Sequence, residues 1–138
     1  MRKTVFALSM LLSASSHAVS NPPLDITVTG VKEQIGSLRI AIFNSAESFQ
    51  KEPHLTLTIP VDADTMQFSV DELVAGEFAV MLFHDVDSNE KMKTNLVGMP
   101  REPWGASLEG TAIFGPPKWE DVMFKHTDAG TSLTIELH

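Results

Sequence analysis

The chain has 138 residues and a formal net charge of −8, and it contains no cysteine. This length suits one domain with one hydrophobic core, and the negative charge argues against a nucleic acid or an anionic membrane as a partner. Without cysteine the chain forms no disulfide and carries no lipid anchor of the lipoprotein type, so its stability must come from the core.

The first segment has the composition of a secretory signal peptide. Arg2 and Lys3 form a basic start, an apolar run covers Val5–Leu12, and small residues precede a cleavage position after Ala18. The apolar run is too short to cross a bilayer, which requires about 20 residues. We therefore expect residues 1–18 to be removed, residues 19–138 to form one domain, and the protein to be periplasmic or secreted. No later segment is apolar enough to span a membrane.

Most of the remaining chain alternates apolar and polar residues with a period of two, which is typical of strands with one buried face. We predict such strands over Leu24–Thr29, Leu38–Ile42, Leu55–Val61, Met66–Val70 and Leu133–Leu137. Glycines between these segments, at Gly36 and Gly130, mark turns.

One further strand differs from the others because both of its faces are apolar. In Gly76–Asp85 the apolar residues occupy consecutive positions, so this strand should be central and covered on both sides. A last short strand is predicted over Val122–Lys125, and residues 45–50 and 71–76 each suit a single helical turn. About seven short strands predict an all-β, antiparallel β-sandwich with one long ordered loop, with an up-and-down barrel as the alternative.

The long loop is the polar segment His84–Ser107, and motifs within it and on either side of it carry a family resemblance. The stretches FAVMLFHD, DVDSN, NLVGMPREPWGAS and FGPPKWEDVMF follow one another at plausible spacing. In these motifs the chain resembles a secreted bacterial family known as domain of unknown function 2141. The resemblance implies a transthyretin-like or immunoglobulin-like β-sandwich and no assigned activity. The chain departs from the family pattern at Glu90 and Lys93, where Gly and Asp are usual.

The first part of this loop is a candidate calcium site. Asp85, Asp87 and Asn89 stand at alternate positions, as in the opening of many calcium loops, and a hard cation takes six to eight oxygen ligands. Asn95 and Glu102 are candidates to complete the ligand set.

Other residues argue against a calcium loop of the EF-hand type. Such a loop needs Gly at its sixth position and Glu at its twelfth, where this chain has Glu90 and Leu96. Lys91 and Lys93 also place positive charge beside the candidate ligands. The alternative is a network of Asx turns, in which Asp and Asn side chains bind nearby backbone N–H groups and keep a long loop rigid.

Two larger side chains of the loop have structural and functional interpretations. His84 is expected at the rim of the sandwich with a hydrogen bond to the following loop, and a metal-ligand role is the alternative. Trp104 is expected to pack the loop onto the sandwich, and exposed it would be a recognition aromatic. Trp119 is expected to be buried where the chain returns to the sheet.

No nucleophile or catalytic set is indicated, because the chain lacks cysteine and a Gly-x-Ser-x-Gly motif. We therefore predict a non-enzymatic binding or accessory module without a cofactor, with a protein or glycan of the cell envelope as its partner. Its binding surface would be the end of the sandwich that carries His84–Trp104. The alternative function is a module that binds calcium or another metal through Asp85, Asp87 and Asn89.

Overall fold

The computed structural model describes residues 21–91, 102–109 and 117–138. The described chain forms eight strands, one short 3-10 helix and one short α-helix. The strands are β1 (Leu24–Thr29), β2 (Ser37–Phe43), β3 (Leu55–Pro60), β4 (Met66–Val70), β5 (Gly76–Asp85), β6 (Trp104–Ala106), β7 (Phe124–His126) and β8 (Thr131–Glu136). The helices are η1 (Ser107–Glu109) and α1 (Trp119–Val122).

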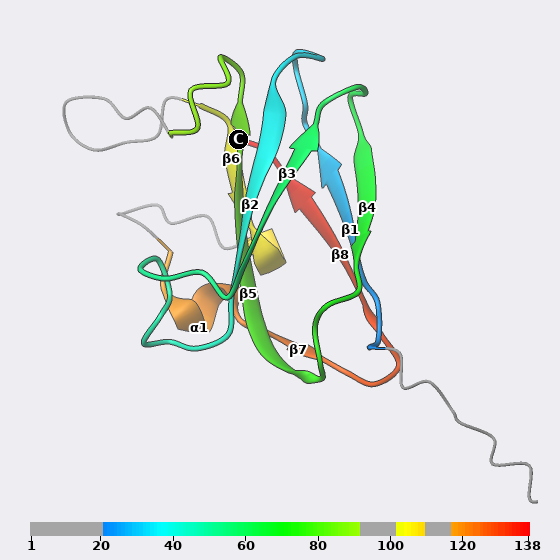
Figure 1. The fold of residues 1–138 in the computed structure, drawn as a ribbon, viewed down its shortest axis with the longest axis vertical. Helices are drawn as coiled ribbons and strands as arrows, with labels where there is room; N and C mark the ends of the chain where they lie inside the picture. Colours follow the sequence, from blue (N-terminus) through cyan, green and yellow to red (C-terminus); the bar gives the residue numbers. More distant parts are fainter. Residues whose placement is uncertain (1–20, 92–101, 110–116) are drawn as a thin grey trace, which may run out of the picture.

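The strands form two sheets that face each other, as Figure 1 shows. One sheet has three strands in the order β4-β1-β8, and the other has five, in the order β3-β2-β5-β6 with β7 also paired to β5. The predicted all-β architecture with sandwich-like packing is thereby confirmed.

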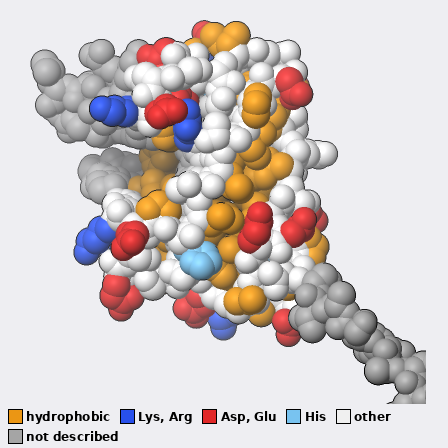
Figure 2. All heavy atoms as spheres, viewed as in Figure 1, with side chains coloured by type: hydrophobic (Ala, Val, Ile, Leu, Met, Phe, Trp, Pro, Cys, Tyr) orange, Lys and Arg blue, Asp and Glu red, His pale blue; other side chains and the backbone are white. Residues whose placement is uncertain are grey.

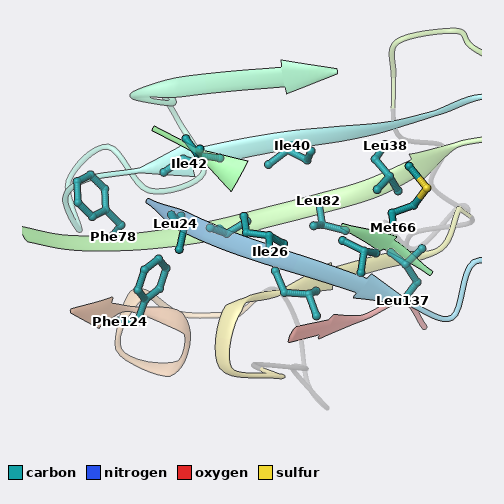
Figure 3. Close-up of a cluster of buried hydrophobic side chains, with 14 of the residues drawn as sticks. Leu24, Ile26, Leu38, Ile40, Ile42, Met66, Phe78, Leu82, Phe124 and Leu137 are labelled. Carbon is teal, nitrogen blue, oxygen red and sulfur yellow. The ribbon is translucent and has the colours of Figure 1, made fainter. Parts of the chain in front are cut away.

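The main core fills the space between the sheets, because each sheet turns its apolar positions inward (Figure 3). On β1 these positions are Leu24, Ile26 and Val28, which are at most 1 % exposed. The alternation predicted for this strand therefore places one complete side of it against the opposite sheet.

The strand β5 is covered on its inner face and partly on its outer face, so the prediction of cover on both sides holds for only part of the strand. Val80 and Leu82 face the main core, whereas Ala79 belongs to a second, smaller cluster on the other face, where Met81 and Phe83 are half-buried. The buried members of that cluster are Phe43, Phe49, Ala79, Ala106 and Val122. Trp119 is half-buried rather than buried, and its ring packs edge-on against Phe49 with the ring centroids 5.8 Å apart.

Three details of the predicted strands are wrong. The sandwich is not wholly antiparallel, because β1 and β8 pair in parallel. The last short strand begins later than predicted, since Val122 ends α1 and β7 covers Phe124–His126. The segment expected as one long loop contains β6, which pairs with β5 and is too short to show a periodic pattern.

Of the two predicted helical turns, one is present. At residues 45–50 the Phe49 N–H donates to Ser45 O at 3.1 Å, which closes one helical turn, although no helix extends from it. Residues 71–75 form no helical turn and run as an irregular connection into β5. The short helix α1 lies instead at residues 119–122.

The sandwich is closed along one side by its last residues. Trp104 N–H donates to His138 O at 3.2 Å, and His138 N–H donates to Trp104 O at 3.0 Å. These bonds join β6 of the larger sheet to the chain that leaves β8 of the smaller sheet. On the opposite side, β3 and β4 are the outer strands of their sheets. No helix in the described ranges is long and apolar enough to cross a membrane.

Candidate functional site

The candidate site lies at the end of the sandwich where β5 finishes. His84 and Asp85 are its last two residues, and the chain continues from them into a turn over residues 86–91 (Figure 1). The connection between β1 and β2, residues 30–36, reaches the same end because Ser37 pairs with Asp85. Two connections from distant parts of the sequence therefore meet beside these two side chains.

Asp85 is a fully buried carboxylate that organises the turn after β5. Its Oδ1 accepts the N–H of Asn89 at 3.1 Å, and its Oδ2 accepts the N–H of Glu90 at 2.9 Å. Asp87 Oδ1 accepts the same Asn89 N–H at 3.4 Å, and Asn89 Oδ1 accepts the N–H of Lys91 at 2.9 Å. These are the bonds that the Asx-turn interpretation predicts.

The turn also contains two residues in the left-handed backbone region. Ser88 has φ 56° and Glu90 has φ 67°. A left-handed φ is the conformation that glycine adopts without steric cost. In this chain Asp85 holds the turn with a glutamate at position 90, since its Oδ2 accepts the Glu90 N–H.

A cation that sequence reasoning missed neutralises the buried carboxylate. Arg39 on β2 places Nε 3.3 Å from Asp85 Oδ2, and its Nη2 lies 3.4 Å from Glu90 Oε1. Its Nη1 donates to Thr58 Oγ1 on β3 at 3.0 Å. An arginine on the polar face of a strand is an ordinary surface residue by pattern, so its partnership depends on the pairing of β2 with β5.

His84 is more deeply placed than the predicted rim histidine. Its side chain is 1 % exposed, and Nε2 donates to Ile35 O at 2.6 Å. Its imidazole thus bonds the connection that precedes β2, and only its backbone N–H bonds the segment that follows β5, at Pro103 O. That connection comes close because Gly36 has φ 67° and lacks a Cβ, which would lie 2.1 Å from Asp85 O.

A cleft of about 350 Å³ opens at this end of the sandwich. Lys32 and Glu33 form one wall, and the other wall comes from the end of β5 and the approach to β6. Its lining residues are Lys32, Glu33, His84, Val86, Asp87, Glu102 and Pro103. The second wall is fixed by the bond from His84 N–H to Pro103 O, at 2.8 Å.

Three carboxylates beside this cleft converge in a way that could hold a metal ion. Asp85, Asp87 and Glu102 each place an oxygen within 4.8 Å of the other two. Asp85 and Glu102 are buried, whereas Asp87 is exposed. The sequence suggested all three, together with Asn89, but Asn89 Oδ1 is used by the turn. Asn95, the remaining candidate ligand, lies outside the described residues.

Trp104 opens β6 opposite Phe83 and is half-buried. Its side chain packs against the second apolar cluster, while its backbone bonds to His138. The Trp104 side chain therefore packs its segment onto the sandwich, as the first of the two interpretations of this residue expected.

A larger hollow, of about 520 Å³, lies on the outer face of the five-stranded sheet. Apolar side chains such as Met81 and Phe83 form part of its lining, and Arg39 and Glu90 form one rim. Arg39 and Glu90 thus connect the rim of the hollow to Asp85, which follows His84 of the end cleft. We centre the candidate site on the end cleft because it gathers polar side chains from two walls, which an open sheet face does not.

These features define a class of protein: a small, two-sheet β-sandwich with a polar cleft and an Asx-ordered turn at one end. Within that class the chain belongs to the family described as "Uncharacterized protein conserved in bacteria" (DUF2141), whose model matches residues 26–134. Comparison with curated proteins and with solved structures gave no match.

Proposed function

We propose that this protein is a non-enzymatic binding module that engages its partner through the end cleft. The observation that carries the proposal is the cleft itself, whose walls are held in place by bonds from His84 and Asp85. Its volume is at the lower end of the range for small-ligand sites, about 300–1,000 Å³. It suits one protruding group of a larger partner.

We further propose where this module acts and on what kind of partner. With cleavage after Ala18, the domain over residues 19–138 would work in the periplasm or outside the cell. The partner would then be a protein or a glycan of the envelope. The cleft offers both Lys32 and Glu33 on its exposed wall, which supports recognition of a polar group by hydrogen bonds and charge.

The proposed role is non-enzymatic because two buried polar groups at the end of β5, His84 and Asp85, are occupied by structural bonds. Nε2 of His84 donates to a backbone carbonyl, and both oxygens of Asp85 accept backbone N–H groups. A general base must instead reach a substrate proton with a nitrogen or oxygen that it can turn toward the substrate.

The test is a photo-crosslinking amino acid placed at position 32, on the exposed wall of the cleft. In intact cells we expect one discrete adduct, because a specific partner would hold this wall at close range. The matched control carries the same amino acid at position 47, an exposed position at the opposite end of the sandwich. Identical adducts at both positions, or none at position 32, would overturn the proposal.

A second candidate function is binding of a divalent cation, favoured by the three carboxylates that converge beside the cleft. Calcium prefers oxygen ligands of this kind. The Arg39 guanidinium opposes it, because it already neutralises Asp85.

Calorimetric titration with Ca²⁺ distinguishes the two functions. If the carboxylates bind calcium, millimolar Ca²⁺ should release or absorb heat and raise the melting temperature, and Glu102→Gln should reduce both effects. No heat together with an unchanged melting temperature removes calcium binding and leaves the cleft proposal untouched.

A further inference from the structure

The open side of the sandwich has an apolar seam between β3 and β4. Leu55, Leu57 and Ile59 on β3 face the core but are only half-buried, and so is Phe68 on β4. The inward residues of the neighbouring β2 are at most 2 % exposed. Figure 2 shows hydrophobic side chains gathered along this gap. Among the described residues, no backbone bonds join β3 to β4 in the way that those of Trp104 and His138 close the other side.

The backbone of β3 also faces outward along this seam. Val61 N–H donates to Gly36 O at 3.1 Å, so Val61 is bonded across to the chain that leads into β2. In an antiparallel pair such bonded positions recur at every second residue. Leu55, Leu57 and Ile59 therefore turn their backbone groups to β2. Thr56 and Thr58 turn their N–H and C=O groups away from it. In the described chain no strand pairs with this edge of β3.

The two edge strands carry little of the usual protection against pairing. Natural edge strands are commonly blocked by charged side chains, proline or bulges. The sequences LTLTIP of β3 and MQFSV of β4 contain no charged residue, and the proline of β3, Pro60, is its last residue, which leaves the N–H groups of Thr56 and Thr58 intact. A neutral, β-branched edge with outward N–H groups is the arrangement to which an extended peptide adds as a strand.

We propose that the β3 edge binds an extended segment of another protein as an additional strand. The segment alternates apolar and polar residues, so that its apolar side chains cover the seam. Its ends carry lysine or arginine, because exposed acids flank the seam at both ends. They are Asp62 and Asp64 in the β3–β4 connection, and Asp71 and Glu72 after β4. A second copy is disfavoured, because each chain has a net charge of −8.

The test measures fluorescence anisotropy of a short labelled peptide in which valine and threonine alternate between flanking lysines. Two control peptides isolate the causes of binding: one has glutamate in place of each lysine, and the other is N-methylated at alternate residues. We expect N-methylation to weaken binding by about tenfold or more, because it removes strand-to-strand hydrogen bonds. The glutamate peptide should also bind more weakly.

A pair of variants locates the bound peptide. Thr56→Pro removes an N–H that faces solvent, a change that an edge strand tolerates, while Thr56→Val keeps the N–H. We expect Thr56→Pro to weaken peptide binding by about tenfold or more and Thr56→Val to leave it unchanged. Circular dichroism should show the same β-sheet content in both variants.

Amide hydrogen exchange of the wild-type protein gives a second measurement that does not depend on any variant. The added peptide should slow exchange at Thr56 and Thr58, and leave Leu57 unchanged because its N–H already bonds to β2. The proposal is overturned if protection appears only at residues 86–91, or if N-methylation leaves the affinity unchanged. It is equally overturned if the protein dimerises in sedimentation experiments and Thr56→Pro abolishes the dimer, since the occupant would then be a second copy.

Discussion

At the residue scale, the candidate site depends on a few buried polar groups that are all hydrogen-bonded. Asp85 is 0 % exposed, yet it has an arginine and two backbone N–H groups as partners. A buried charge with such partners is stable, whereas removal of one partner leaves the others unsatisfied. The Asx pattern in the sequence pointed to Asp85, while Arg39 could be found only once the strands were paired.

The substitution Asp85→Ala should destabilise the protein. It removes the acceptor of the Glu90 N–H, leaves the Asn89 N–H only its longer bond to Asp87, and removes the buried partner of Arg39. We therefore expect a loss of about 1–3 kcal/mol in the free energy of unfolding. Urea denaturation measures this loss. Asp62→Ala, at an exposed turn position, is the matched control and should change stability by less than about 0.5 kcal/mol. Equal stability of the two variants would contradict the structural role of Asp85.

The substitution Glu90→Gly should stabilise the protein. Glu90 has φ 67°, and glycine relieves the left-handed conformation, so we expect a gain of about 0.5–1 kcal/mol in the free energy of unfolding. The gain is reduced slightly by loss of the exposed ion pair with Arg39. Glu90→Gln, which loses that pair and keeps the side chain, is the control and should give no gain. A loss of stability in Glu90→Gly would show that the ion pair matters more than the backbone.

At the scale of elements, β6 shows how a short strand is specified by its neighbours rather than by its own sequence. Its three residues pair with β5 and approach the chain after β8. At Gly105 a Cβ would lie 2.6 Å from Ile135 Cγ2 and 2.7 Å from Glu136 O. Glycine is therefore required here for close approach of two backbones.

The substitution Gly105→Ala tests this close approach. The added methyl group has to displace backbone atoms of β8, and we expect a loss of about 1–3 kcal/mol in the free energy of unfolding. Gly76→Ala is the control, because a Cβ there would meet its nearest neighbour, Phe78, at an ordinary 3.6 Å. Chemical denaturation of both variants should separate them clearly. Similar midpoints would mean that β6 and β8 move apart at little cost.

At the scale of the whole molecule, the sandwich has one closed and one open side, and this asymmetry should govern its local stability. The central strands β2 and β5 are paired on both sides, while β3 and β4 are paired on one side. Opening of a strand costs more when it breaks two ladders.

Amide hydrogen exchange should therefore be slowest in β2 and β5 and faster in β3 and β4. Within β3, the N–H of Leu57 should exchange more slowly than that of Thr58, because only the first is bonded to β2. Peptide-resolved or NMR-detected exchange measures both comparisons. Protection in β3 equal to that in β5 would show that the open side is covered in solution.

The sequence alone determined the all-β character, the position of most strands and the central place of β5, because these follow from the alternation of apolar residues along each segment. It also indicated the polar turn after Asp85. Tertiary structure decided the rest: the parallel pairing of β8 with β1, the strand β6, the Ile35 partner of His84 and the approach of Arg39 and Glu102 to the same end. These features join residues far apart in the chain, and a local pattern carries no information about which distant edge or loop a segment will meet.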